Sequence, residues 1–372
     1  SDVYKRQRPG VAYQARQLGL AFNAVLGVIM SLFLSLGAGT ILSGVGVADA
    51  LMQPAKTYLQ IVGGFCILNA LIPICSSYLR AFGFSKEPLY ASIIGNVINF
   101  CLNAFFLFVL HKGVAGVATA TVISRIINLV IVVLLGAVLV KAKQHPERES
   151  NRAVMGQIIR IGLPSACETA IYNVSMTLVI RFLNQMDAQG LNVTARSYTM
   201  QITNFSYCVG AALAQANAIM TGWHIGAKEY DACDRGTKKA AVIGVIVAVI
   251  LETVFTLCSG WIMQLFSKDP QMVSLVGKLL AIDIVLEIGR VTNLVYGQAL
   301  KTSGDAVFPV VMGACFMILC SVGGTYLFGI RLGLLAVGAY IGMTGDECVR
   351  AVGMYLRWKS GKWKEKGLVK SR

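Results

Sequence analysis

The sequence has few charged residues and few histidines for its length. Asp, Glu, Lys and Arg make up 14% of the 372 residues, whereas hydrophobic residues make up 56%. Charged residues form about a quarter of an ordinary soluble domain, so this composition excludes that class. The three histidines fall outside the hydrophobic blocks, and no Cys-x-x-Cys pair occurs among the ten cysteines. We therefore expect no metal site of the usual histidine and cysteine kind.

The hydrophobic residues form blocks that are long enough to cross a membrane as helices. About 20 helical residues span the hydrocarbon core, and a spanning segment must satisfy its own backbone hydrogen bonds. The sequence therefore predicts an all-α, polytopic membrane protein. We expect ten transmembrane helices, at about 18–42, 57–79, 89–110, 114–140, 158–183, 198–222, 239–266, 273–300, 307–330 and 333–356.

Lysine and arginine are distributed unevenly between the two sets of alternate loops. One set, together with the tail 357–372, holds most of them, and the other set is expected to hold only Lys56, Lys112, Arg196, Lys268 and Arg331. Basic residues collect on the cytoplasmic side of membrane proteins, which predicts a multi-pass protein of the cell (inner) membrane with a cytoplasmic C-terminus. The net charge of +15 then reflects orientation, and we expect membrane lipid as a partner and no nucleic acid. The basic, tryptophan-bearing stretch WKSGKWK of the tail is expected to be an interfacial anchor against anionic lipid.

Two short stretches, YLRAFGFSKEPLY and ALKTSGDAVFPVV, repeat at a constant offset. The matched residues are Leu79, Arg80, Gly83 and Pro88 in the first and Leu300, Lys301, Gly304 and Pro309 in the second. This parallel repeat predicts two six-helix lobes of a twelve-helix fold. The expected domains are an N-lobe at 8–140, a cytoplasmic linker at 141–156, a C-lobe at 157–356 and a basic cytoplasmic tail at 357–372.

The N-lobe contains only four of the six helices that the repeat requires. We therefore expect the chain to be truncated at its N-terminus by two helices. Residues 1–7, SDVYKRQ, look like the in-frame translation of a sequencing adapter, and we expect them to be foreign sequence.

Several stretches resemble one transporter family, the multidrug and toxic compound extrusion (MATE) transporters. They are residues 79–103, 113–125, 160–168, 286–310 and 357–363. The resemblance implies a two-lobed, twelve-helix exporter whose central cavity opens alternately to the two sides of the membrane. It also implies a monomeric antiporter that exports small organic cations or amphipathic compounds against Na+ or H+, coupled at membrane-embedded carboxylates and without another cofactor.

A carboxylate within a span is costly and usually faces a cavity or a partner. Glu168 follows Pro164 by about one helical turn and shares a helix face with Tyr172 and Ser175. Family members with a Na+ site in this helix carry their glutamate at the position of Tyr172, so the role of Glu168 stays open.

The predicted helix at 273–300 carries a second polar stripe. Asp283, Glu287 and Arg290 fall at i, i+4 and i+7. We expect Glu287 and Arg290 to form a structural or gating pair, which leaves Asp283 as the better coupling residue. Asn293 offers an additional oxygen ligand. The candidate cation-coupling residues are therefore Glu168, Asp283, Glu287 and Asn293.

The remaining charges within spans are assigned by spacing. Asp346 and Arg350 are expected to pair at i, i+4, whereas Glu252 and Arg125 have no visible partner in the sequence. Aromatic and methionine side chains repack around varied organic cations. The candidate residues of the substrate cavity are Tyr172, Met176, Phe205 and Tyr207.

Two alternatives remain beside the exporter. A flippase or exporter of lipid-linked saccharide shares the fold, but such relatives tend to have cationic cavities, and the carboxylates within the spans favour cationic substrates. An integral-membrane transferase enzyme needs a metal-binding carboxylate motif or a catalytic histidine. The sequence has neither, so we expect no enzyme, no catalytic residue and no metal site.

Overall fold

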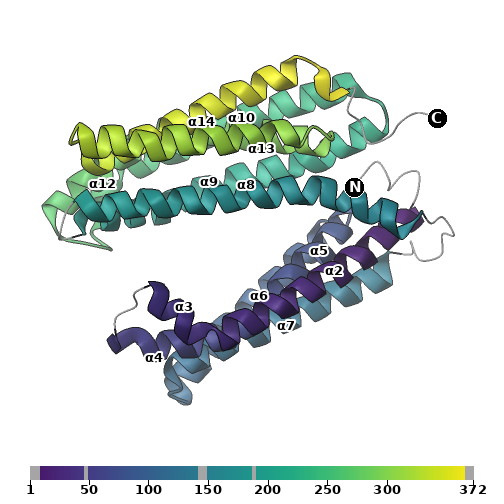
Figure 1. The fold of residues 1–372 in the computed structure, drawn as a ribbon, viewed down its shortest axis with the longest axis horizontal. Helices are drawn as coiled ribbons and strands as arrows, with labels where there is room; N and C mark the ends of the chain where they lie inside the picture. Colours follow the sequence, from purple (N-terminus) through teal and green to yellow (C-terminus); the bar gives the residue numbers. More distant parts are fainter. Residues whose placement is uncertain (1–8, 46–48, 141–148, 187–189, 365–372) are drawn as a thin grey trace. The chain divides into compact units, whose positions relative to one another are not determined.

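The computed structural model describes residues 9–45, 49–140, 149–186 and 190–364 (Figure 1). These residues are mainly helical and include no strand. Residues 1–7, the expected foreign sequence, and residues 141–148, half of the expected linker, lie outside this part of the chain. Two compact units are present, called unit 1 (residues 3–158) and unit 2 (residues 159–372), and each is described by itself.

Unit 1 is a bundle of helices joined by short connections. Its helices are α2 (Pro9–Leu36), α3 (Ala38–Val45), α4 (Asp49–Tyr58), α5 (Ile67–Ala81), α6 (Lys86–Ala104) and α7 (Gly113–Leu139), with π-helical extensions at Leu59–Gly63 (η1) and Phe105–Val109 (η2). Its buried core includes Cys75, Tyr78, Leu79 and Val132. α5 packs against both α2 and α7.

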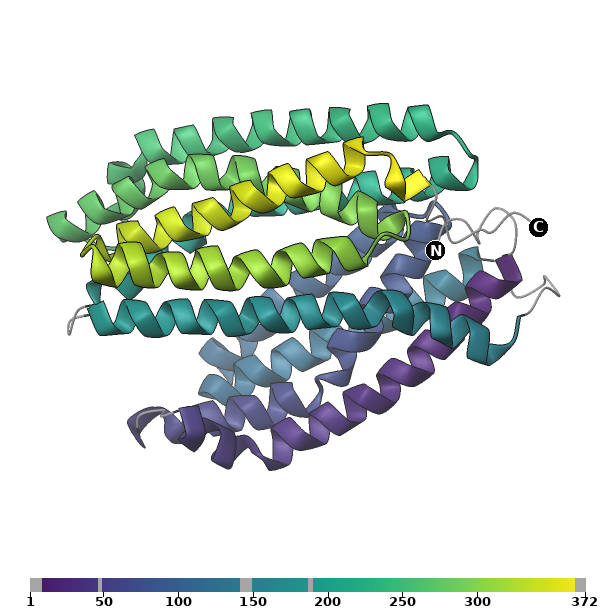
Figure 2. The same ribbon diagram turned by 45° about the horizontal axis from the view of Figure 1, so that its top comes forward.

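Unit 2 is a second bundle of helices (Figure 2). It holds most of the buried polar side chains of the described residues. Its helices are α8 (Asn151–Met186), α9 (Leu191–Gly226), α10 (Tyr230–Leu257), α11 (Ser259–Met263), α12 (Pro270–Thr302), α13 (Val307–Phe316) and α14 (Leu335–Lys359), with π-helical segments at Met317–Val322 (η4) and Thr325–Arg331 (η5) and a short 3-10 helix at Lys362–Lys364 (η6). α8 begins within unit 1, and its first residues, 151–156, fall in the expected linker.

The Asp269 side chain caps α12 by accepting from the Gln271 amide at 2.9 Å.

The ten predicted spans are all helical, but not all are apolar enough to qualify as spans by themselves. Five helices within the described residues are long and apolar enough to cross a membrane, or six if Met52–Gly63 and Ile67–Ala81, bent by 40°, form one span. The helical, polytopic class is thus confirmed, whereas the number of ten spans stays a prediction for the other four helices. α8, α9, α12 and α14 fall short because they carry the polar side chains of unit 2.

The repeated motif forms the same turn in each unit. Gly83 follows α5 with a φ of 89°, and Gly304 follows α12 with a φ of 94°. The residue after each glycine donates its amide back to the matched leucine carbonyl, Phe84 to Leu79 at 3.1 Å and Asp305 to Leu300 at 2.9 Å. Glycine adopts this left-handed backbone at little cost. The constant offset in sequence thus corresponds to a shared helix termination.

The tryptophans expected to anchor in lipid are instead buried in unit 2. Trp358 and Trp363 are 1% and 2% exposed, and their rings stack with centroids 4.1 Å apart. The indole of Trp358 donates to Asp234 of α10 at 2.9 Å, and the indole of Trp363 donates to the Trp358 carbonyl at 2.9 Å. The tryptophan part of the anchor prediction is wrong, because these internal partners satisfy both N–H groups.

α12 contributes side chains to two separate apolar clusters of unit 2, one nearer each end of the helix. Leu279, Leu280 and Leu286 belong to one cluster, and Val291 and Leu300 belong to the other. Asp283, Glu287 and Arg290 lie on the α12 segment around the junction of these clusters. The helix therefore presents ionisable side chains in the middle of an apolar bundle.

Gly289 allows α12 and α14 to approach closely at this level. A Cβ atom at Gly289 would lie 2.9 Å from the Cys348 amide nitrogen and 2.9 Å from the Glu347 carbonyl carbon. Both are backbone atoms, so relief requires movement of a helix. The missing side chain thus fixes the distance between the charged residues of the two helices.

We predict that Gly289→Ala lowers the midpoint of thermal unfolding in detergent, at a cost of about 1–3 kcal/mol for overpacking. Gly345→Ala in α14 is the matched control, because a Cβ there meets nothing within 4 Å. The control is expected to be neutral or slightly stabilising, since alanine favours helix. Equal unfolding temperatures for the two variants would contradict the close approach.

Candidate functional site: a buried carboxylate cluster and its cavity

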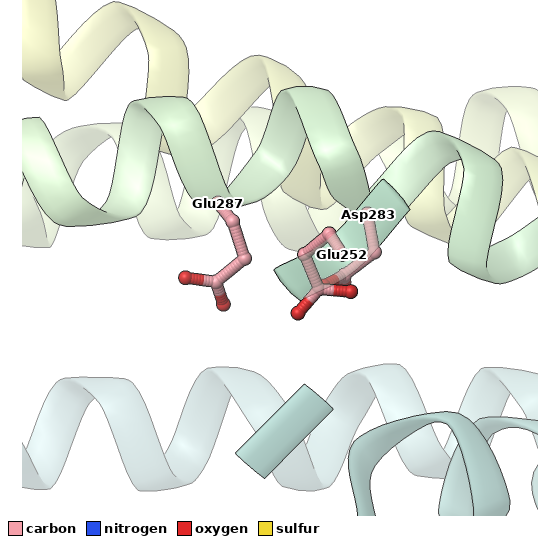
Figure 3. A group of neighbouring side chains, drawn as sticks. All are labelled: Glu252, Asp283 and Glu287. Atoms are coloured by element: carbon pink, nitrogen blue, oxygen red, sulfur yellow. The ribbon is translucent and has the colours of Figure 1, made fainter. Parts of the chain in front are cut away.

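Three carboxylates meet inside unit 2. One carboxylate oxygen from each of Glu252, Asp283 and Glu287 lies within 4.8 Å of the others (Figure 3). Glu252 and Glu287 are fully buried, and Asp283 is 2% exposed. Both oxygens of Glu252 and one oxygen of each of the other two have no hydrogen-bond partner of ordinary geometry among the described residues. Oxygen ligands gathered in this way suit a hard cation or shared protons.

Small residues bring Glu252 of α10 to α12. A Cβ at Gly244 would lie 2.7 Å from a Val291 methyl group, and a Cβ at Gly210 of α9 would lie 2.8 Å from the other. α12 therefore packs closely against both helices. Gly244, Ala248 and Glu252 follow at i, i+4 and i+8 on one buried face of α10.

The sequence prediction left Glu252 without a partner, and its neighbours come from another helix. Gly244 and Ala248, two turns and one turn before Glu252, were the signal in the sequence that another helix packs against this face of α10. The expectation of no metal site was based on motifs within the sequence, and such motifs do not include side chains from different helices.

A network of ion pairs extends from this cluster into α14. The expected pair of Glu287 and Arg290 is present, and Arg290 also lies 3.7 Å from Glu347. Arg350 contacts Glu347 at 2.9 Å and, as expected from spacing, Asp346, at 2.8 and 3.0 Å. Arg290 and Arg350 therefore compensate the charge of three carboxylates, namely Glu287 of α12 and Asp346 and Glu347 of α14.

Asp283 connects the cluster to a cavity of about 230 Å³ within unit 2, called the unit 2 cavity. Its apolar and aromatic wall includes Tyr172, Met176, Met200, Tyr207, Tyr340 and Met343. Its charged lining consists of Arg196, Asp283, Arg290, Asp346 and Glu347. Ser321, in the π-helical segment η4, also lines it and donates to Asp346 at 3.0 Å.

The predicted substrate residues divide between the cavity and the surface. Tyr172, Met176 and Tyr207 line the unit 2 cavity, and the Tyr207 ring lies 6.0 Å from the Arg290 guanidinium. Phe205 is 69% exposed, packs against the Phe255 ring and is not part of this lining.

Two predicted coupling residues have other partners. Glu168 accepts from Lys301 of α12 at 2.6 Å, and Ser175 from the same predicted stripe is buried at 1% exposure. The side-chain amide of Asn293 donates to Glu347 at 3.0 Å. Glu168 is thus compensated by a lysine, and Asn293 stabilises the α14 carboxylates.

Arg196 was expected in an outer loop and lies instead within α9. It is 6% exposed, and its only described hydrogen bond is to the Met176 sulfur at 3.6 Å. Helix α9 begins at Leu191, before the predicted span, which places Arg196 in its second turn. The hydropathy of the sequence did not indicate this start, because Asn, Thr, Arg and Ser dominate residues 192–197.

We predict that Arg350→Gln destabilises unit 2 by about 3–5 kcal/mol, because it leaves two buried carboxylates with less compensation. Thermal unfolding in detergent measures the effect. Adding Asp346→Asn to Arg350→Gln should restore part of the loss, since the second change removes one of the two charges. Arg181→Gln at an exposed position of α8 is the control, and an Arg350→Gln midpoint equal to that of this control would contradict the prediction.

Comparison with known proteins places the chain in a family. The MatE family pattern matches residues 6–105 and 164–327. The uncharacterized transporter YisQ of Bacillus subtilis is 33% identical over 371 residues, covering 98% of this chain and 80% of YisQ. The probable multidrug resistance protein YoeA of the same organism is 22% identical over 365 residues, covering 94% of this chain and 77% of YoeA.

The fold also matches solved transporter structures. The eukaryotic MATE transporter AtDTX14 superposes with a TM-score of 0.87 at 17% identity, covering 98% of this chain and 81% of that one. At this identity the match concerns the fold alone. Together with the family match, it shows that this chain belongs to the MatE family, a family of integral membrane efflux transporters.

Proposed function

We propose that this protein is a cation-coupled antiporter that exports cationic or amphipathic organic compounds by alternating access. The observation that carries the proposal is the buried cluster of Glu252, Asp283 and Glu287, whose oxygens approach within 4.8 Å. The coupling ion is Na+ or H+. The protein acts in the cell (inner) membrane, with its C-terminus in the cytoplasm.

Electrostatics gives the cluster an affinity for cations. Three carboxylates this close do not all remain ionised without compensation, because like charges in a poorly hydrated site repel strongly. Arg290 supplies one positive charge through its pair with Glu287. The remaining two carboxylates, Glu252 and Asp283, need protons or a bound cation.

Asp283 links coupling to transport, because it belongs to the cluster and lines the unit 2 cavity. A cation bound at the cluster uses the negative charge that would otherwise attract an organic cation. The coupling ion and the substrate therefore weaken each other's binding, and this coupling is reciprocal. Such competition at a shared carboxylate is the basis of exchange.

Within this proposal the predicted coupling residues have different roles. Asp283 binds the cation together with Glu252, while Glu287 orients Arg290. Asn293 holds Glu347 in position. Glu168 and Lys301 form an interhelical ion pair between α8 and α12 and take no part in coupling.

We predict that the protein lowers ethidium accumulation in a pump-deficient bacterium, and that Glu252→Gln or Asp283→Asn each returns accumulation to the level of cells without the protein. Glu168→Gln should retain export if its amount in the membrane is unchanged. Asp231→Asn, an exposed carboxylate of α10, is the matched control for Glu252→Gln. Full export by both cluster variants, at equal membrane levels, would contradict carboxylate coupling.

A second prediction separates the two coupling ions. If Na+ occupies the cluster, replacing choline chloride with sodium chloride at constant ionic strength should raise the unfolding temperature of the purified protein, because a ligand that binds only the folded state stabilises it. Glu252→Gln should abolish this difference, and Asp231→Asn should preserve it. A sodium effect that survives in Glu252→Gln would place the ion elsewhere, whereas absence of an effect in the unmodified protein assigns coupling to protons.

A further inference from the structure

A second pocket of unit 2, called the lysine pocket, has a volume of about 460 Å³ and lies where α9, α12 and α14 begin. Gln271, Ser274 and Lys278 line it at i, i+3 and i+7, which places them on one face of α12. All three side chains can donate hydrogen bonds, and no carboxylate is among the described residues of the lining. The polar side of this pocket therefore suits an anionic group.

Lys278 has no acidic partner. Among the described residues no carboxylate forms an ion pair with its ammonium group. It follows Pro270, the first residue of α12, by about 12 Å of helix at the usual rise per residue. A lysine at such a depth in a spanning helix is costly unless it extends to the membrane interface or meets an anion.

The short helix α11 indicates the depth of this lysine in the membrane. A Cβ atom at Gly277 would lie 3.4 Å from the Ser259 hydroxyl oxygen, so α11 packs beside α12 next to Lys278. Trp261 of α11 is 73% exposed, and tryptophan is enriched at the headgroup level of membranes. The lysine pocket therefore lies at the level of the phospholipid headgroups.

The start of α14 forms an apolar wall of the pocket. Leu334 and Leu335 line it and are 44% and 41% exposed. Leu335 has a φ of 53°, a conformation that is uncommon for a leucine and persists only where its surroundings hold it. The next amide, that of Ala336, donates to the Asn192 side chain of α9 at 3.1 Å. This bond fixes the wall against α9, so the pocket pairs a polar side with an apolar side.

We infer that the lysine pocket binds the headgroup of an anionic phospholipid, with the phosphate at Lys278, Ser274 and Gln271 and an acyl chain along Leu334 and Leu335. An ammonium group finds no carboxylate in the described lining, so phosphatidylglycerol is favoured over zwitterionic phospholipids. The lysine pocket and the unit 2 cavity share no lining residue. The inference therefore goes beyond the proposed function and does not depend on it.

Native mass spectrometry of the purified protein tests the inference by measuring the dissociation constant of the first bound lipid. We expect dioleoyl phosphatidylglycerol to bind about tenfold more tightly than dioleoyl phosphatidylcholine, the lower range for hydrogen bonds to a charged group. The two lipids have the same acyl chains and phosphate and differ in the charge of the headgroup. Lys278→Gln should reduce the preference to less than about twofold, Ser274→Ala should reduce it in part, and Lys278→Arg should retain it.

Lys268→Gln is the matched control, because Lys268 is an exposed lysine just before α12 and outside the pocket lining. It should keep the full preference. The inference is overturned if the unmodified protein binds both lipids equally or binds neither, or if Lys278→Gln weakens both lipids equally, which assigns Lys278 a structural role. An equal loss of preference in Lys268→Gln and Lys278→Gln also overturns it, because general attraction to basic residues then explains the binding.

Glycerol 3-phosphate separates a lipid from a soluble phosphate compound, since it carries the same anionic group without acyl chains. We expect it to bind more weakly than phosphatidylglycerol, because it makes no contact with the apolar wall. If it binds to the unmodified protein as tightly as the lipid does, the ligand of the pocket is a soluble phosphate compound and the lipid assignment is wrong.

Discussion

The cost of keeping ionised side chains away from water governs the organisation of unit 2. An unpaired charge in an apolar interior is unfavourable by several kcal/mol, and unit 2 buries acidic groups on α10, α12 and α14. Most of them receive an arginine partner. Arg350 contacts Asp346 and Glu347, and Arg290 contacts Glu287. The exceptions, Glu252 and Asp283, are therefore the groups at which a cation has most to contribute.

The same constraint gives the small residues of the bundle a functional meaning. Gly244 and Gly210 place α12 close to α10 and α9, and Gly289 places it close to α14. With larger residues at these contacts the carboxylates would be farther from one another and from their arginines. Close backbone packing and charge compensation therefore depend on the same contacts. The distance between two helices sets the distance between the charged side chains that they carry.

The division between a carboxylate cluster and a neighbouring cavity suits an exporter. Glu252 and Glu287 are enclosed, whereas Asp283 belongs to both the cluster and the cavity lining. In the function proposed above, a coupling cation and a substrate therefore affect each other without sharing all their ligands. Arg196 adds a positive group to the cavity lining, on a different helix.

The sequence by itself determined the features that depend on local spacing. Hydrophobic blocks gave the helical membrane class, the repeat located equivalent turns at Gly83 and Gly304, and the three-to-four-residue period of a helix gave the pairs of Glu287 with Arg290 and Asp346 with Arg350. Only the tertiary structure decided which helix faces meet. It brought Glu252 to Asp283, Lys301 to Glu168 and Arg196 into the cavity. The reason is that helical periodicity fixes neighbours within one helix, whereas neighbours on different helices depend on how each helix is rotated and packed in the bundle.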